Sequence, residues 1–464
     1  MSPSAPNSTG NLMPAVAPAK SCTTSDVSVL QGETSQNGRS GNEFARLWHG
    51  RLQTVVNALA VLFAATLCMP ITVNWVILTP GLVGWLLLMI LRALSAQPVY
   101  VRPPLFYPLI TMAAVATVSG IANGAGAHEA FASFLTMRPL IAYFWAFDIM
   151  RRNERVQALC LSAALTLSSL AGAAGALEQM ADFHPFGFHW LQGTGFLSGP
   201  MAYAGQMQLF SILSLAFLLT GAHKQLFGQP RWHLWAAITA GNFLGVIFAS
   251  ERSAWLGFLV GTLVVTALVS WRTTAKVAGL GLAALLAVWN VIPVFKTRLL
   301  PLLDPMHDVS TRARLVVWQK AVEVFREHPI LGVGPLNFPH VVIPEALVPG
   351  QPQYLGHAHN NYLHILATTG LVGLSVFMWL LCATLNLSWK QYHSASPEQS
   401  AEPLSVSAPV MTVQRAIGLG MLGALVSLAV AGIFEYNFGT GQVRLAQWFF
   451  VAFLVPAAYL HRKS

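Results

Sequence analysis

The sequence predicts an all-α fold: a polytopic membrane helical bundle of about 12 transmembrane helices that carries one helical loop subdomain. Of the 464 residues, 55% are hydrophobic and only 9% are charged, and the mean hydropathy is +0.56. One soluble core could not bury so many apolar side chains. Apolar runs long enough to cross a bilayer lie at about 53–70, 74–92, 104–123, 130–149, 156–177, 200–221, 233–250, 254–271, 277–294, 362–388, 416–435 and 443–461.

These runs divide the chain into four parts. Residues 1–50 are rich in Ser, Thr, Asn, Gly and Pro and contain no apolar run, so we expect a disordered cytoplasmic tail rather than a cleavable signal peptide. Residues 51–294 hold transmembrane helices one to nine, and 362–464 hold helices ten to twelve. Between them, residues 295–361 are long enough to fold as a loop subdomain.

The basic residues orient the predicted bundle. Placing both termini in the cytoplasm puts 17 of the 26 Lys and Arg residues on that side, in agreement with the positive-inside rule. The net charge of +9 therefore reflects topology, and we expect no nucleic-acid partner. The 4 cysteines are scattered without a pairing pattern, which predicts neither a disulfide nor a cysteine metal site.

The predicted loop subdomain contains one amphipathic helix. Leu315, Trp318, Val322 and Phe325 recur at helical spacing, which places them on one face of a helix over about 311–328. His328-Pro329 ends this helix, and the glycines that follow predict a tight turn. A Pro-rich strap over 339–352 then leads to a pair of histidines.

This histidine pair lies where the loop subdomain enters the tenth apolar run. His357 and His359 are followed by Asn360 and Asn361. An imidazole titrates near neutral pH, so His359 is a candidate to exchange a proton with a molecule bound at the membrane surface. The two asparagines either orient His359 or cap the helix that follows.

Arginines at costly positions form the second part of the candidate site. An arginine in or against hydrocarbon must pair or face water, so Arg138, Arg252 and Arg314 are candidate ligand-binding residues, with Arg312 beside the last. Alternatively, Arg252 forms an internal salt bridge with a carboxylate such as Glu251, or Arg138 pairs inside the bundle. Several guanidinium groups near a histidine are typical of a phosphate or diphosphate site.

We expect no metal at this site. Asp304, His307 and Asp308 are interpreted as turn residues, because no carboxylate cluster of metal-binding spacing lies near the loop. The alternative of a zinc site at His357, His359 and His364 lacks a nearby Cys or a well-spaced carboxylate.

Three features together resemble a known family. They are Arg314-Leu-Val-Val-Trp318 followed by the segment from His328 to Phe338, then His359-Asn360-x9-Gly370-x2-Gly373, and the twelve-span layout with one dominant late loop. The chain resembles the O-antigen ligase and polymerase superfamily, inner-membrane glycosyltransferases of bacteria in the GT-C class. The motifs cover roughly residues 200–390, and the remainder agrees by hydropathy.

The resemblance implies an enzyme that takes a glycan from undecaprenyl diphosphate and joins it to a hydroxyl of the lipid A-core oligosaccharide, at the periplasmic face. By position, His359 would be the general base, and Arg252 and Arg314 would hold the donor diphosphate. Arg138 joins them on the ground of its burial cost. Four residues are expected to support the site, and no cofactor or metal is required for a one-step inverting transfer. These four residues are His357, Asn360, Asn361 and Arg312.

Three alternatives stay open. A polymerase of the superfamily would present two arginine-bearing loops, whereas the 179–199 loop has no Lys or Arg. A protein O-oligosaccharyltransferase would often carry a further soluble region, and this sequence ends at Ser464. From a different class, a secondary transporter would show paired halves, which the sequence lacks.

Overall fold

The computed structural model describes residues 48–456 and 459 except for 96, 98, 124–125, 182–191, 198, 228–231, 292, 305–306, 342–355 and 395–412. Residues 1–47 of the expected tail and most of the strap lie outside the described residues, and 48–50 already belong to a helix. Those described form helices and no strands, which confirms the all-α prediction. A first helix runs through 48–65. The others are α2 (Ile71–Leu94), α3 (Phe106–Ala122), α4 (Ala127–Leu135), η1 (Arg138–Leu140), α5 (Ile141–Met150), α6 (Glu154–Ala181), α7 (Pro200–Thr220), α8 (His223–Phe227), α9 (Trp232–Phe248), α10 (Arg252–Val269), α11 (Trp271–Val291), α12 (Pro293–Leu299), η2 (Leu300–Leu303), α13 (Val309–Glu327), α14 (Phe338–Val341), α15 (Asn361–Ser394), α16 (Val413–Ala431) and α17 (Gly441–Val451).

Six of the described helices are long and apolar enough to cross a membrane: α2, α6, α7, α10, α15 and α16. A seventh span results if α4 and the η1–α5 segment, bent by 44° at their junction, count as one. The polytopic bundle is therefore confirmed, while the count of twelve stays a prediction.

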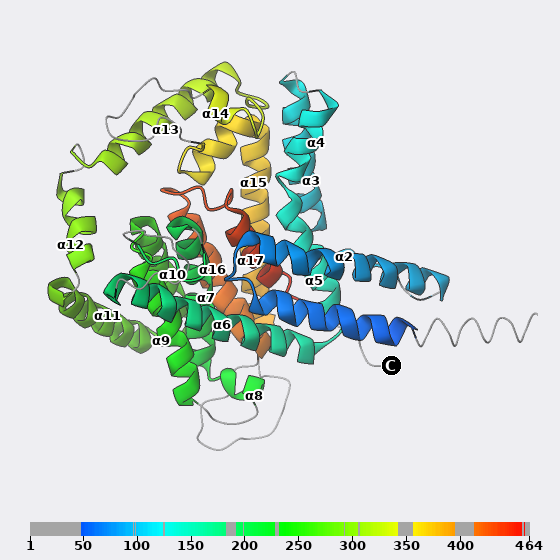
Figure 1. Cartoon of the computed structure of the whole chain (residues 1–464), viewed down its shortest axis with the longest axis horizontal. Helices are drawn as coiled ribbons and strands as arrows, with labels where there is room; N and C mark the ends of the chain where they lie inside the picture. Colours follow the sequence, from blue (N-terminus) through cyan, green and yellow to red (C-terminus); the bar gives the residue numbers. More distant parts are fainter. Residues whose placement is uncertain are drawn as a thin grey trace, which may run out of the picture.

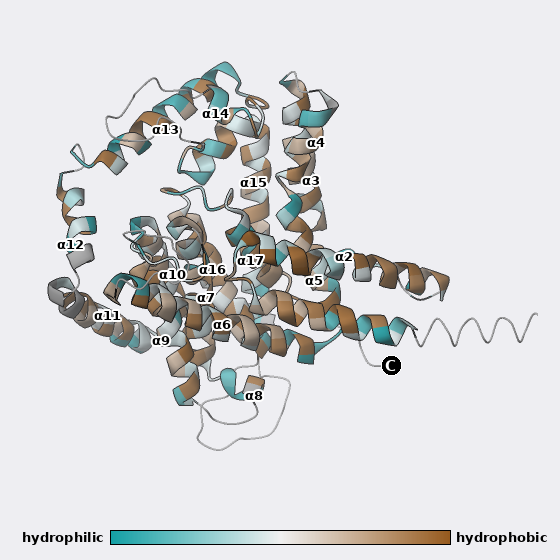
Figure 2. Ribbon diagram, in the orientation of Figure 1, coloured by the Kyte–Doolittle hydropathy of each residue, from teal (hydrophilic) through white to brown (hydrophobic). Residues whose placement is uncertain are grey.

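The centre of the bundle is α7, which packs against α9, α10 and α16 (Figure 1). Small residues let α10 approach α16 closely, because a Cβ at Gly257 or Gly261 would collide with the backbone of α16. From α10, α11 and α12 lead outward to α13, which returns over the bundle to the start of α15 (Figure 1). Polar residues concentrate on α13, α14 and the turn before α15, whereas brown apolar residues dominate the long helices (Figure 2).

The loop helix predicted at 311–328 is α13, begun by Asp308, whose carboxylate accepts the amide N–H of Thr311. Its buried face is not the row of large apolar residues seen in the sequence. Ala313, Val317, Ala321 and Val324 are buried, whereas Leu315 is 46% exposed. Small and β-branched residues face the protein because α13 lies close to α15 and the histidine turn. The predicted helix is present, and its large apolar residues Trp318, Val322 and Phe325 are half-buried.

The glycines of the His-Asn-x9-Gly-x2-Gly pattern kink α15. Gly370 has φ of 66°, outside the helical range, and the segment after α13 docks at this break. The N–H groups of Val333 and Gly334 donate to carbonyls of the first part of α15, and Leu371 N–H donates to the carbonyl of Pro329. A Cβ at Gly370 would collide with the backbone of the docked segment. Both glycine motifs therefore fix how the loop subdomain meets the start of α15.

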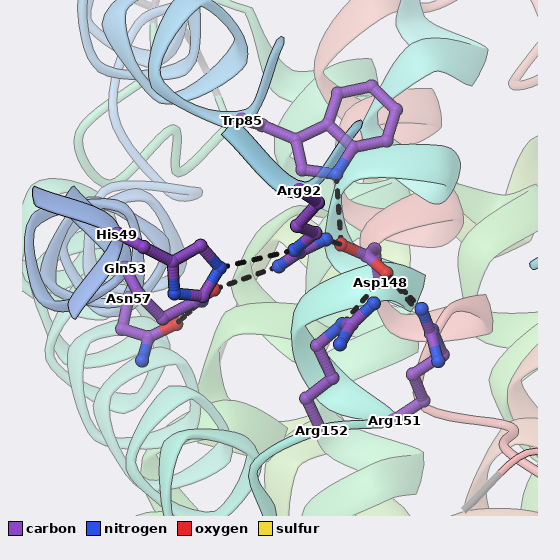
Figure 3. A network of polar contacts seen from close by, with 8 residues as sticks. All are labelled: His49, Gln53, Asn57, Trp85, Arg92, Asp148, Arg151 and Arg152. Atoms are coloured by element: carbon purple, nitrogen blue, oxygen red, sulfur yellow. Dashed lines mark hydrogen bonds and ion pairs between the residues drawn. The ribbon is translucent and has the colours of Figure 1, made fainter. Parts of the chain in front are cut away.

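A buried ion network joins α2 to the end of α5 (Figure 3). The Asp148 carboxylate accepts from Arg92 at 2.7 Å, Arg151 at 2.6 Å and Arg152 at 3.1 Å, and from the Trp85 indole at 3.2 Å. Its side chain is only 4% exposed. One buried carboxylate thus organises three guanidinium groups.

Asp148→Asn is expected to lower the free energy of unfolding by about 3–5 kcal/mol, because it leaves buried guanidinium groups without their counter-charge. Arg92 would keep only its neutral partners His49 and Gln53. Thermal unfolding of the purified protein in detergent measures the effect. Glu323→Gln, which removes an exposed ion pair with Lys320, is the control and should leave the melting temperature unchanged. Equal melting of wild type and Asp148→Asn would refute this role.

Candidate functional site

The two histidines lie on a tight turn that opens α15. His359 has φ of 45°, in the left-handed region that residues with a Cβ adopt at a cost. Asn360 follows, and its side-chain oxygen accepts the N–H of Leu363 at 2.9 Å. Asn360 therefore caps the start of α15. A residue of α13 also holds the turn in place, because the Trp318 indole N–H donates to the carbonyl of Ala358 at 2.9 Å.

His359 pairs with a carboxylate from a distant part of the chain. Its Nδ1 lies 3.1 Å from Oε2 of Glu435, in the turn between α16 and α17, and the two side chains are 15% and 8% exposed. Burial acts to raise the pKa of Glu435, but the hydrogen bond from His359 and nearby positive charges outweigh it, so the pKa lies below its ordinary value. An ionised carboxylate only accepts hydrogen bonds, so Nδ1 of His359 carries a proton, and in the neutral ring the lone pair is then on Nε2.

Asn361 holds the segments that carry His359 and Glu435 in place relative to each other. Its amide donates to Asn437 Oδ1 at 2.7 Å, and its oxygen accepts the N–H of Phe438 at 3.0 Å. The N–H of Asn361 also donates to the carbonyl of Gly432. The asparagine predicted beside the histidine thus joins α15 to the turn that carries Glu435.

His357 is the second imidazole of the turn. Its ring centroid lies 4.2 Å from that of His359, and its Nδ1 accepts the backbone N–H of His359 at 3.2 Å. Burial, together with neighbouring His359, lowers the pKa of His357 to about 4. His357 is therefore neutral at physiological pH and supports His359 as a hydrogen-bond acceptor.

Acidification from pH 7 to pH 5 is expected to lower the free energy of unfolding by about 2 kcal/mol through His357. The unfolded chain takes up a proton near pH 6.5, whereas the folded state resists protonation until the pH approaches its pKa of about 4. Stability is therefore lost as pH falls through the unfolded value. Denaturation of the purified protein in detergent at both pH values, with His357→Gln as the comparison, measures this. An identical pH dependence in the variant would contradict the assignment.

Arg314 lies beside the histidine pair. Its Nε donates to the carbonyl of Phe434 at 3.2 Å, next to Glu435, and its NH1 donates to the hydroxyl of Ser310 at 2.5 Å. Its positive charge acts on both Glu435 and His357. The structure thus brings together His357, His359 and Arg314.

Arg252 is the first residue of α10. It forms an ion pair at 2.8 Å with Asp308, the residue that caps α13. The partner is therefore Asp308 and not Glu251, which instead accepts from Gln192 at 2.8 Å. Burial and the neighbouring Glu435 raise the pKa of Glu251. Ser250, just before it, has φ of 53°, so left-handed backbone occurs at both the hairpin tip and the histidine turn.

Two predicted arginines have different surroundings. Arg312 has a buried Nε with no hydrogen-bond partner, on the same helix as Arg314. Arg138 begins η1 and is exposed, so the burial cost expected from its place in an apolar run does not arise. It lies over the ring of Trp75, 5.0 Å from its centroid, away from the contacts of Arg314 and Arg252. Within the described residues, no contact links Arg138 to the other predicted arginines.

The histidine pair and Glu435 also have the spacing of a metal site. Potential ligand atoms of His357, His359 and Glu435 lie within 4.8 Å of one another. Two imidazoles and a carboxylate suit a divalent transition-metal ion. The expectation of a metal-free site stays a prediction.

Sequence reasoning missed Glu435. It lies 76 residues after His359, at the end of an apolar run. A carboxylate at the edge of an apolar run is costly and often functional, so this signal was present in the sequence.

One family model matches the part of the chain that carries most of these residues. A model of the O-antigen ligase family matches residues 234–378, which include Arg252, Arg314, His357 and His359 but end before Glu435. No curated protein matches the chain. Over this segment, the chain is similar to the O-antigen ligase family.

Proposed function

We propose that the protein is an O-antigen ligase that moves a glycan from undecaprenyl diphosphate to a hydroxyl of lipid A-core oligosaccharide. The observation that carries the proposal is the His359–Glu435 pair with Arg314 on the adjacent carbonyl. A base and a cation thus share one small site. The family match supports lipid-linked glycan chemistry in general, and the donor and acceptor are part of the proposal.

His359 acts as general base in this proposal. A sugar hydroxyl is too weak an acid to ionise on its own, so its proton must leave as the new bond forms. Nε2 takes that proton, and Glu435 stabilises the imidazolium that results. The acceptor oxygen attacks the anomeric carbon, the bond from this carbon to the diphosphate oxygen breaks, and the configuration inverts in one step.

The arginines compensate the charge of the departing diphosphate. Arg314 has free donor capacity beside the histidines, and Arg312 has a buried unpartnered Nε on the same helix. A guanidinium group binds two phosphate oxygens at once, and its positive charge stabilises the leaving group as negative charge grows on it. Arg252 is paired with Asp308, so it holds the start of α13 in place. Its positive charge also stabilises the departing diphosphate.

A reconstituted assay tests this function. Purified protein in proteoliposomes would receive undecaprenyl-diphosphate-linked glycan with or without lipid A-core. Transfer of the glycan to lipid A-core supports a ligase. Growth of the glycan on its own lipid carrier, without lipid A-core as acceptor, would identify a polymerase and overturn the proposal.

Chelation is expected to leave the transfer rate unchanged, because the arginines supply the positive charge that a metal would otherwise provide. The initial rate with and without an excess of EDTA or phenanthroline measures this. Loss of activity that zinc, magnesium or manganese restores would instead assign a metal to His357, His359 and Glu435.

A further inference from the structure

Arg138 and Arg444 form a second cationic group, apart from Arg314 and Arg252. It lies where the first turns of α2 and α17 meet the break between α4 and η1. A Cβ at Gly441, the first residue of α17, would contact Ile71, the first residue of α2. Arg444 on α17 reaches across to this break, where its NH1 donates to the carbonyl of Thr136 at 2.7 Å. Three separate elements therefore converge here.

This convergence contains polar donors that no protein group satisfies. Arg444 is 7% exposed; NH1 and NH2 donate to backbone carbonyls, but its Nε is buried without a partner. The indole N–H of Trp75 is also buried and unpartnered. Arg138, which is exposed, lies over the Trp75 ring and makes no hydrogen bond or ion pair with any described residue. Buried donors left unpaired are costly and call for an acceptor.

The surroundings favour an anionic acceptor. The first turns of α2 and α17 contain no acidic residue, and helix N-termini carry partial positive charge. The titratable groups that act on Arg444 are Tyr436 and Arg138, neither of which is a carboxylate. Two guanidinium groups without an acid match the forked geometry of phosphate recognition.

Tyr436 separates this cationic group from the histidines. Its ring centroid lies 3.9 Å from that of His364 and 5.5 Å from that of His357. Along the α16–α17 turn, Phe434 contacts Arg314, Glu435 contacts His359, and Tyr436 acts on Arg444. Arg314 therefore acts on this turn before Glu435, the residue that holds His359, and Arg444 acts on it after Glu435.

We propose that Arg138, Arg444 and Trp75 form a phosphate subsite for the acceptor, a phosphorylated amphiphile whose hydroxyl reaches His359. The inference rests on the proposed function. In-line displacement requires the leaving group and the attacking hydroxyl on opposite sides of the anomeric carbon. The Arg314 side takes the donor diphosphate, so the other cationic group takes the acceptor. Arg138 is thereby assigned to the acceptor rather than to the donor.

Direct binding tests the subsite without any transfer. Wild type, Arg138→Gln and Trp75→Phe would be titrated, in nanodiscs of uncharged lipid, with bisphosphorylated lipid A and with its dephosphorylated form. Wild type is expected to bind the phosphorylated probe about tenfold or more tightly, a preference that Arg138→Gln abolishes. Trp75→Phe keeps the ring but loses the N–H, so its preference should fall by less. Equal binding of both probes by wild type overturns the subsite.

Arg102→Gln is the matched control, because Arg102 is also exposed and packs over an aromatic ring, at 6.0 Å from the Phe106 centroid. It should keep the wild-type preference. In the transfer assay, Arg138→Gln should raise the KM for phosphorylated acceptor about tenfold and leave the KM for donor unchanged. A raised donor KM would return Arg138 to the donor. Competition by phosphatidylglycerol that depends on Arg138, with an unchanged acceptor KM, would identify a membrane phospholipid as ligand and overturn the acceptor assignment. If no glycan is transferred at all, the proposed function fails, while the binding experiment still tests the anion site.

Discussion

His359→Ala is expected to reduce the rate constant of glycan transfer by roughly 10²–10⁴-fold, the range by which a positioned general base accelerates proton transfer. The imidazole Nε2 is the only lone pair that the Glu435 pairing leaves free on this ring. Without it, the acceptor hydroxyl must lose its proton to water. Single-turnover transfer from lipid-linked glycan to lipid A-core, with purified protein, measures the change.

The control is His307→Ala. His307 is an exposed histidine that pairs with Asp304 near the start of α13, and its loss should leave the rate at the wild-type value. Donor binding by His359→Ala should also be retained, because the guanidinium groups remain. A His359→Ala protein that folds normally and transfers glycan at the wild-type rate would show that another group is the base.

Local sequence patterns predicted what depends on neighbours along the chain. The helical period found α13, and the His-Asn pair marked the start of α15. The glycine spacing identified a special segment but not its purpose, which is the kink at Gly370 that receives the segment after α13. Periodicity also could not choose the buried face of α13, because close approach to another helix favours small residues over large ones.

Contacts between distant segments explain what the sequence did not reveal. Arg252 was expected to hold phosphate or to pair with Glu251, and its partner is Asp308, 56 residues away. Arg92, Arg151 and Arg152 are among the 17 basic residues that the positive-inside rule places in the cytoplasm, yet all three bind the buried Asp148. The cost of burial singled out Arg252 but not the three arginines around Asp148, and only the fold shows which opposite charge each one meets.

Glu435→Gln is expected to lower the transfer rate constant by roughly 10²–10⁴-fold without weakening donor binding. The carboxylate fixes the ring proton on Nδ1 and stabilises the imidazolium that forms during transfer. A glutamine amide can present its NH2 group to Nδ1 instead, which moves the ring proton to Nε2 and removes the base. Separate measurement of the single-turnover rate constant and of donor affinity distinguishes this effect from a general loss of structure.

Glu435→Asp sharpens the test, because it retains the charge and shortens the side chain. A role in orienting and charging His359 predicts partial recovery of the rate constant in Glu435→Asp relative to Glu435→Gln. The exposed Glu323→Gln should behave as wild type, since Glu323 contacts only Gln319 and Lys320 on its own helix. A Glu435→Gln protein with the wild-type rate constant would mean that His359 needs no carboxylate, and that the contact at 3.1 Å serves packing alone.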